Sequence, residues 1–189
     1  LSANNSLANA EAYRYGSESQ YNAIRYAWIY IENVAKVPDM TEDERNERIA
    51  EAKKLLAEAG FGDDHPLSFN LLYNTSESHQ RIAIAAASMW KKNLGVDVKL
   101  QNQEWKTYID SRNTGNFDVI RASWVGDYNE PSTFLSLLTS THSGNISRFN
   151  DPAYDKIIHQ ATLETTAKAR NTDYNMAEKI LMEKAPIAP

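Results

Sequence analysis

Residues 66–100 decide the fold and read PLSFNLLYNTSESHQRIAIAAASMWKKNLGVDVKL. The stretch 66–74 is apolar and rich in β-forming residues, so it predicts a strand. Apolar residues recur at helical spacing over 76–94, which predicts a helix that Gly95 is placed to end. The side chains expected on its buried face are Ile82, Ala86, Met89 and Trp90. Apolar and polar residues then alternate over 96–100, which predicts a second strand.

The chain continues with the same alternation of elements. Residues 104–115 are long enough for a short helix that ends at Gly115, and residues 117–124 read as a third strand. Strand, helix, strand, helix and strand with short links predict two consecutive βαβ units, and therefore three neighbouring parallel strands. The expected fold class is α/β, with a parallel-containing sheet flanked by helices.

Helices are also predicted before this region. Thr41 is followed three residues later by Glu44, which is a capping box, and the helix that it starts should end at Gly60. Within residues 1–40, apolar and aromatic residues recur at helical spacing and predict one amphipathic helix. The residues that carry this pattern are Tyr21, Ile24, Trp28, Ile31 and Ala35.

Three helix starts are predicted after the third strand. Pro131 and Pro152 each stand where a proline begins a helix, and Asp151 is placed to cap the second of these helices. A last helix is expected from about Thr166 to Lys184.

Composition excludes several classes of protein. The chain has 189 residues and a formal net charge of −5, and neither sign of charge forms the basic stripe that nucleic-acid binding requires. Its longest apolar run is far shorter than the ~20 residues that span a bilayer. The absence of cysteine rules out disulfides and thiol catalysis. We therefore expect one domain, or one with an appendage, that neither binds nucleic acid nor spans a membrane.

The sequence lacks the common motifs of enzymes and metal sites. It contains no GxSxG, GxxxxGK or GxGxxG, and its four histidines show no metal-binding spacing. We expect no catalytic residues, no metal and no cofactor.

The stretch FDVIRASWVGDYNEP, residues 117–131, carries charge and aromatic side chains at the end of a predicted strand. Ligands of parallel sheets bind beyond the carboxyl ends of the strands. Trp105, Trp124 and Asp127 could therefore face one cleft. The alternative is that both tryptophans are core residues, that Arg112 and Arg121 are surface charges, and that Asp127 is only a turn residue.

Residues 45–135 closely resemble the C-terminal lobe of periplasmic oligopeptide-binding proteins, the solute receptors of ABC peptide importers. The resemblance continues through RFNDPAYDKII and TDYNMAEKILMEKAPIAP, and it covers residues 41–189. It implies one lobe of a type II periplasmic-binding-protein-like fold. It also implies a fragment that lacks the N-terminal lobe and the closing strand, with residues 1–40 unplaced.

The resemblance implies a role for each residue at the strand end. Asp127 of WVGDYNEP would receive the α-ammonium group of a peptide. Backbone groups for the first ligand residues would come from Trp124, Val125 and Gly126. Side-chain pockets, or partners for acidic ligand groups, would come from Trp105, Arg112 and Arg121. Valine stands at position 125, where some relatives have cysteine, which keeps the backbone role but changes the pocket wall.

The resemblance thus implies a periplasmic, non-enzymatic receptor for oligopeptides with a free N-terminus, which delivers them to an ABC transporter membrane permease. Main-chain hydrogen bonds would supply affinity without reading ligand side chains. Within the family, the alternative is a receptor for another solute, such as a dipeptide or a cell-wall peptide. Outside it, the alternatives are an α/β hydrolase or transferase domain that uses Asp127 and an arginine, and an interaction module with an aromatic face on residues 13–30.

Overall fold

The computed structural model describes residues 41–187. The chain divides into two compact units, the first ending at Ala122 and the second beginning at Ser123. The amphipathic helix predicted within residues 1–40, and with it the proposed aromatic face on 13–30, lies outside the described residues.

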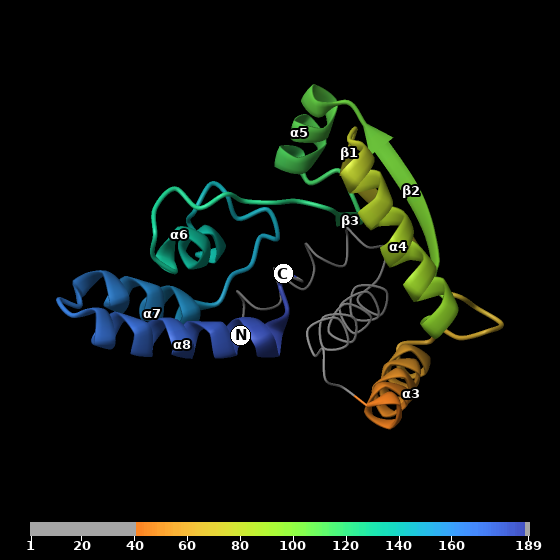
Figure 1. Ribbon diagram of the computed structural model, residues 1–189, viewed down its shortest axis with the longest axis horizontal. Helices are drawn as coiled ribbons and strands as arrows, with labels where there is room; N and C mark the ends of the chain where they lie inside the picture. The colour runs from red at the N-terminus through yellow and green to blue at the C-terminus, as the bar shows by residue number, and fades with distance from the viewer. Residues whose placement is uncertain (1–40, 188–189) are drawn as a thin grey trace, which may run out of the picture. The chain divides into compact units, whose positions relative to one another are not determined.

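The first unit is built on a three-stranded sheet of order β2-β1-β3, in which β1 pairs in parallel with both neighbours (Figure 1). This confirms the predicted α/β class and the parallel neighbouring strands. The strands are β1 (Ser68–Asn74), β2 (Asp97–Gln103) and β3 (Val119–Ile120). The helices of this unit are α3 (Glu42–Glu58), α4 (Glu77–Leu94) and α5 (Trp105–Thr114).

Helix ends follow the local signals in the sequence. The Thr41 hydroxyl accepts a hydrogen bond from the Glu44 N–H at 3.3 Å, and the Glu44 carboxylate accepts one from the Thr41 N–H at 2.9 Å, which completes the predicted capping box of α3. Helix α4 ends at Gly95, whose φ of 73° is left-handed and favours glycine. Gly115 ends α5 in the same way.

The first core confirms one predicted residue of α4 and corrects two. Trp90 is 1% exposed and meets Phe69 of β1 edge-on, with ring centroids 5.3 Å apart. Ile82 is 52% exposed and Met89 is also exposed, so their predicted burial is wrong. The buried residues of α4 are Ala83, Trp90 and Leu94, with Ala86 partly buried against the core. Each misassigned residue precedes a buried one and is therefore turned about 100° away from it on the helix.

The third strand is shorter than the predicted 117–124. Only Val119 and Ile120 pair with β1, and the Arg121 N–H adds one further bond to the Leu72 carbonyl at 2.8 Å. The Arg121 carbonyl instead accepts a hydrogen bond from the Tyr108 hydroxyl at 2.8 Å. A side chain of α5 therefore takes the acceptor that a longer strand would use, and the chain leaves the sheet.

The second strand is longer than predicted. It pairs with β1 from Ser68↔Asp97 to Asn74↔Gln103, so it continues past Leu100 through polar residues. Alternation of apolar residues ends at Leu100, which is itself exposed. The backbone pairing with β1, rather than side-chain burial, extends β2 to Gln103.

The second unit is helical. It contains α6 (Ser132–Leu135), the 3-10 helix η1 (Ser136–Leu138), α7 (Pro152–Leu163) and α8 (Ala167–Lys184). Helices α7 and α8 lie side by side (Figure 1). The helix starts at Pro131, Pro152 and Thr166 are confirmed, and the side chain of Asp151 caps α7 by accepting the N–H groups of Ala153 and Tyr154. The helices between residues 41 and 187 include none with the length and apolar character to cross a membrane.

We expect Trp90→Ala to lower the free energy of unfolding by about 3 to 5 kcal/mol, because it empties a buried site beside Phe69. The matched control is Trp105→Ala, which removes an exposed indole and should cost about 1 kcal/mol or less. Urea denaturation followed by circular dichroism measures both. Equal losses in the two variants would contradict the assignment of Trp90 to the core and of Trp105 to the surface.

Candidate functional site

A polar cluster lies at the carboxyl ends of the strands in the first unit. Asn74 is the last residue of β1, Arg121 follows β3, and His79 comes from the start of α4. The Nδ1 atom of His79 lies 2.8 Å from the Asn74 Oδ1 and 3.3 Å from the Arg121 Nη1. A protonated Nδ1 donates to Asn74, whereas an unprotonated Nδ1 accepts from Arg121, so one tautomer cannot make both bonds.

The environment of His79 favours its neutral form. Burial lowers the pKa of the His79 imidazole from its ordinary value, and the positive charge of Arg121 lowers it further. A neutral histidine does not repel the positive charge of Arg121, but it carries no negative charge to balance it. Among residues 41–187, no carboxylate lies within ion-pair distance of Arg121 or of Arg112.

The hydroxyl of Tyr108 donates to the backbone carbonyl of Arg121 at 2.8 Å, and Arg112 follows Tyr108 by one turn of α5. Burial raises the pKa of the Tyr108 phenol, while the positive charges of Arg112 and Arg121 act to lower it, so both guanidinium groups lie close enough to influence the same hydroxyl. The Nε of Arg112 and the Oε1 of Gln103 are buried and lack a hydrogen-bond partner within the described part of the chain. Buried polar atoms without partners are uncommon and are often found at ligand sites. The Arg112 Nε–H is a donor that an acceptor group of a ligand can complete, whereas the Gln103 Oε1 is an acceptor that needs a donor.

Trp105 lies at the surface beside this cluster. It is the first residue of α5, is 58% exposed, and stacks on Tyr108 with ring centroids 5.6 Å apart. Trp124, in the second unit, is 43% exposed. The alternative interpretation of the two tryptophans as core residues is therefore wrong.

In the second unit, Asp127 lies on an exposed loop whose backbone is fixed against α6. The Asp127 N–H donates to the Thr133 hydroxyl at 2.9 Å. A Cβ atom placed on Gly126 would come within 3.1 Å of a Thr133 methyl and 3.2 Å of the Phe134 ring, so only glycine allows this close approach without movement. The carboxylate of Asp127 is exposed, and no cation among residues 41–187 is within ion-pair distance of it.

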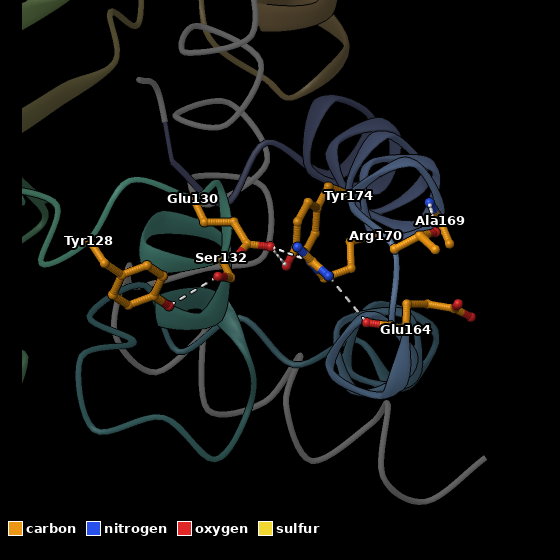
Figure 2. Close-up of polar contacts among 8 residues, drawn as sticks. Tyr128, Glu130, Ser132, Glu164, Ala169, Arg170 and Tyr174 are labelled. Atoms are coloured by element: carbon orange, nitrogen blue, oxygen red, sulfur yellow. Dashed lines mark hydrogen bonds and ion pairs between the residues drawn. The ribbon is translucent and has the colours of Figure 1, made fainter.

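Three residues before Thr133, Glu130 joins the same loop to α8 (Figure 2). Its Oε1 accepts hydrogen bonds from the Arg170 Nε at 2.6 Å and from the Tyr174 hydroxyl at 2.9 Å. Arg170 also donates to the Glu164 carbonyl at 3.3 Å. The Arg170 hydrogen bond is the main reason that the pKa of Glu130 is lowered, followed by the Tyr174 hydrogen bond. We call Glu130, Arg170 and Tyr174 the Glu130 cluster.

The structure brings some predicted site residues together. Arg112 and Arg121 lie around Tyr108, and Trp105 stacks on the same ring, all in the first unit. The stretch from Trp124 to Asp127 belongs to the second unit, so the single cleft shared by Trp105, Trp124 and Asp127 stays a prediction.

Sequence reasoning missed several polar residues of both units. They are Asn74, His79, Gln103, Glu130, Arg170 and Tyr174. The rule that ligands bind at the carboxyl ends of parallel strands could have found Asn74 and Gln103, which are the last residues of β1 and β2. No local signal pairs Glu130 with Arg170, 40 residues away. Residues 41–187 contain no group of three or more histidine, aspartate and glutamate side chains placed to hold a metal ion.

Comparison with known proteins places the chain in a family. Residues 3–145 match the family described as bacterial extracellular solute-binding proteins, family 5 Middle. The chain belongs to this family of bacterial extracellular solute-binding proteins.

Two curated Escherichia coli relatives are similar over 79% of the chain. The periplasmic murein peptide-binding protein MppA is 78% identical over 150 residues, and the periplasmic oligopeptide-binding protein OppA is 52% identical over 150 residues. The crystal structure of Haemophilus influenzae OppA in complex with RPPGFSPFR matches with a TM-score of 0.76 and 46% identity, over 82% of this chain and 29% of that one. The chain spans 27% of the length of each of the two E. coli relatives.

We expect the His79 imidazole to titrate with a midpoint below its ordinary value of about 6.5, because burial and Arg121 both disfavour its charged form. Arg121→Met should raise the midpoint towards 6.5 without reaching it, since burial remains. Histidine-resolved NMR titration measures both, with Arg81→Met on the exposed side of α4 as the control. If Arg121→Met left the titration midpoint of His79 unchanged, the Arg121 guanidinium would not lie close to the His79 imidazole.

We expect Glu130 to make stability depend on pH in the acid range. Its pKa is lowered in the folded protein, so its ion pair stabilises the fold above the pKa of the unfolded chain, and this contribution is lost as pH falls through the folded pKa. Melting temperatures measured between about pH 5 and pH 3 should therefore fall more steeply for the wild type than for Glu130→Gln. Tyr174→Phe, which keeps one of the two donors, should be intermediate. Parallel profiles for wild type and Glu130→Gln would contradict the ion pair.

Proposed function

We propose that this chain supplies a peptide-binding lobe of a periplasmic receptor, which passes oligopeptides to the permease of an ABC importer. Membership of the solute-binding family supports this, and so do the names of the two E. coli relatives, one for murein peptides and one for oligopeptides. The proposed activity is binding rather than catalysis. An enzyme would need a base near Asp127 oriented by a second group.

The observation that carries the proposal is the exposed carboxylate of Asp127 on a loop of fixed backbone. The Thr133 hydroxyl accepts a hydrogen bond from the Asp127 N–H, and the close approach of Gly126 to α6 limits how the loop can move. A carboxylate held in place without a cation is suited to the α-ammonium group of a peptide. Desolvation on ligand binding would strengthen this pair.

The backbone just before Asp127 supports recognition of a peptide main chain. The N–H and carbonyl groups of Trp124, Val125 and Gly126 make no hydrogen bond within residues 41–187, and Val125 is 85% exposed. An extended segment with free backbone groups can pair with an extended peptide as an added strand does. Hydrogen bonds of this kind do not read side chains, so they fit a receptor for many peptide sequences.

Arg112 and Arg121 support binding of a negative group of the ligand. Both guanidinium groups lie near Tyr108, neither pairs with a carboxylate of the described residues, and the Arg112 Nε is buried without a partner. Arginine is suited to carboxylates because its planar fork can make two parallel hydrogen bonds. We propose that these arginines pair with acidic groups of the peptide, and that the exposed face of Trp105 lines a side-chain pocket.

A second candidate function lies within the same family. The 78% identity with a murein peptide-binding protein favours a cell-wall peptide as the preferred ligand. Competition between a murein tripeptide and an ordinary tripeptide of natural amino acids decides between them. A strong preference for the murein peptide supports the second function, whereas equal affinity supports a general oligopeptide receptor.

We expect Asp127→Asn to weaken binding of a free tripeptide by about a hundredfold, which corresponds to about 3 kcal/mol for loss of one partner of a desolvated charge pair. N-acetylation of the peptide should weaken its binding to the wild type by a similar factor. Calorimetry on the protein's full chain measures both, with Asp110→Asn, another exposed carboxylate, as the control. Equal affinity of the wild type for free and acetylated peptides would contradict the role of Asp127.

A further inference from the structure

Asp127 is connected to helix α8 by a continuous series of hydrogen bonds. Arg170 and Tyr174 hold the carboxylate of Glu130, at 2.6 Å and 2.9 Å. The Glu130 carbonyl accepts the Thr133 N–H at 3.1 Å, and the Thr133 hydroxyl accepts the Asp127 N–H at 2.9 Å. All of these residues belong to the second unit.

We propose that Arg170 and Tyr174 are positioning residues for Asp127: by fixing Glu130 they fix Thr133, and through Thr133 the backbone of the residue that receives the ligand's ammonium group. This inference rests on the proposed function. It assigns a role in ligand selection to two residues of α8 that act on the Asp127 loop through Glu130.

The geometry of Glu130 favours a fixed position. Two donors converge on the same oxygen, one of them charged, and charge-assisted hydrogen bonds are about twice as strong as neutral ones. Arg170 and Glu130 are both only partly exposed, at 28% and 34% of their side chains, so solvent screens the pair less than it screens a surface pair. Tyr174 is buried in the core of the second unit, which anchors the other donor.

The Glu130 cluster joins a long, well-packed helix, α8, to a short one, α6. Helix α8 packs against α7 through a buried cluster that includes Tyr154, Ile158, Tyr174 and Ala177. Helix α6 has only four residues, which is too short to hold its own position by helix propensity. The end of α6 is held by Leu135, which lies in the same buried cluster and whose carbonyl accepts a hydrogen bond from the Tyr154 hydroxyl at 2.6 Å. The Glu130 cluster links the start of α6, and with it Thr133, to α8.

Binding sites require support of this kind because a charged group must stand within about 0.5 Å of its productive position. Without the Glu130 cluster, the Asp127 loop keeps its sequence and its carboxylate but loses the hydrogen-bonded link to α8 that runs through Glu130. The expected consequence is a loss of discrimination at the ligand's amino end, rather than a general loss of binding.

The experiment measures the ratio of affinities for a free tripeptide and its N-acetylated form, by calorimetry on the protein's full chain at a temperature well below melting. Arg170→Met removes the charged donor but keeps an unbranched side chain suited to a helix. We expect it to lower the ratio about tenfold, as for loss of a charge-assisted hydrogen bond. Lys168→Met removes a positive charge from the exposed start of the same helix and should leave the ratio at the wild-type value.

Two further variants keep the test decisive. Tyr174→Phe removes one donor and retains the buried ring, so it should lower the ratio by a smaller factor. It also tests the proposal if Arg170→Met does not fold. Glu130→Gln retains an acceptor oxygen for both donors and should preserve more of the ratio than Glu130→Ala. A purely structural role would lower the melting temperature of these variants without changing the ratio.

The outcomes separate this inference from the proposed function. If the wild type binds the free and the acetylated peptide equally well, Asp127 does not receive the ammonium group, and Arg170 and Tyr174 have no positioning role. A high wild-type ratio that persists in Arg170→Met and Tyr174→Phe overturns the positioning role alone. A ratio that falls in these variants and not in Lys168→Met supports the positioning role.

Discussion

The parallel pairing of β1 with both of its neighbours is the constraint on which the first unit depends. Leu72, in the middle of β1, is completely buried, and its carbonyl still accepts the N–H of Arg121 after β3 has ended. Parallel pairing places the carboxyl ends of all three strands at one edge. The residues that leave the strands there, Asn74, Gln103 and Arg121, are all polar. The polar cluster is therefore a direct consequence of strand order and direction.

Both units contain polar groups that have hydrogen-bond partners and buried polar atoms that have none among residues 41–187. In the second unit, the Glu130 carboxylate has two hydrogen-bond donors, whereas the Oδ2 of Asp173 is buried without a partner among the described residues. At the strand ends, Arg112 and Gln103 have buried atoms without a partner among residues 41–187, and Arg121 lies beside His79, whose pKa is lowered by burial and by the charge of Arg121. A buried polar group without a hydrogen-bond partner lowers the stability of the fold unless a ligand or a water molecule supplies the missing hydrogen bond. The unpartnered polar atoms at the strand ends support a binding role there, in addition to the role proposed for the Asp127 loop of the second unit.

Much of the fold could be predicted because its signals are local. Thr41, Asp151 and Gly95 act on neighbouring residues, and the helices they bound were predicted closely. The burial of Ile82 was predicted wrongly because an apolar residue on a helix does not reveal which of two adjacent faces meets the core. The predicted third strand is too long because the hydroxyl of Tyr108, on the preceding helix, donates to the Arg121 carbonyl. The alternation of residues within the strand cannot reveal this contact. For the site, the contacts His79–Arg121 and Glu130–Arg170 join residues 42 and 40 positions apart, which periodicity cannot detect.

The proposed binding of peptides through their main chain and amino terminus can be tested by identifying the ligands that the protein carries when it is purified. Native mass spectrometry of the protein's full chain, followed by sequencing of the released ligands, measures this without a choice of ligand in advance. We predict a heterogeneous set of short peptides with free amino termini, because backbone recognition does not select one sequence. A single non-peptide ligand, or peptides with blocked amino termini, would rule out recognition of the peptide main chain and free amino terminus.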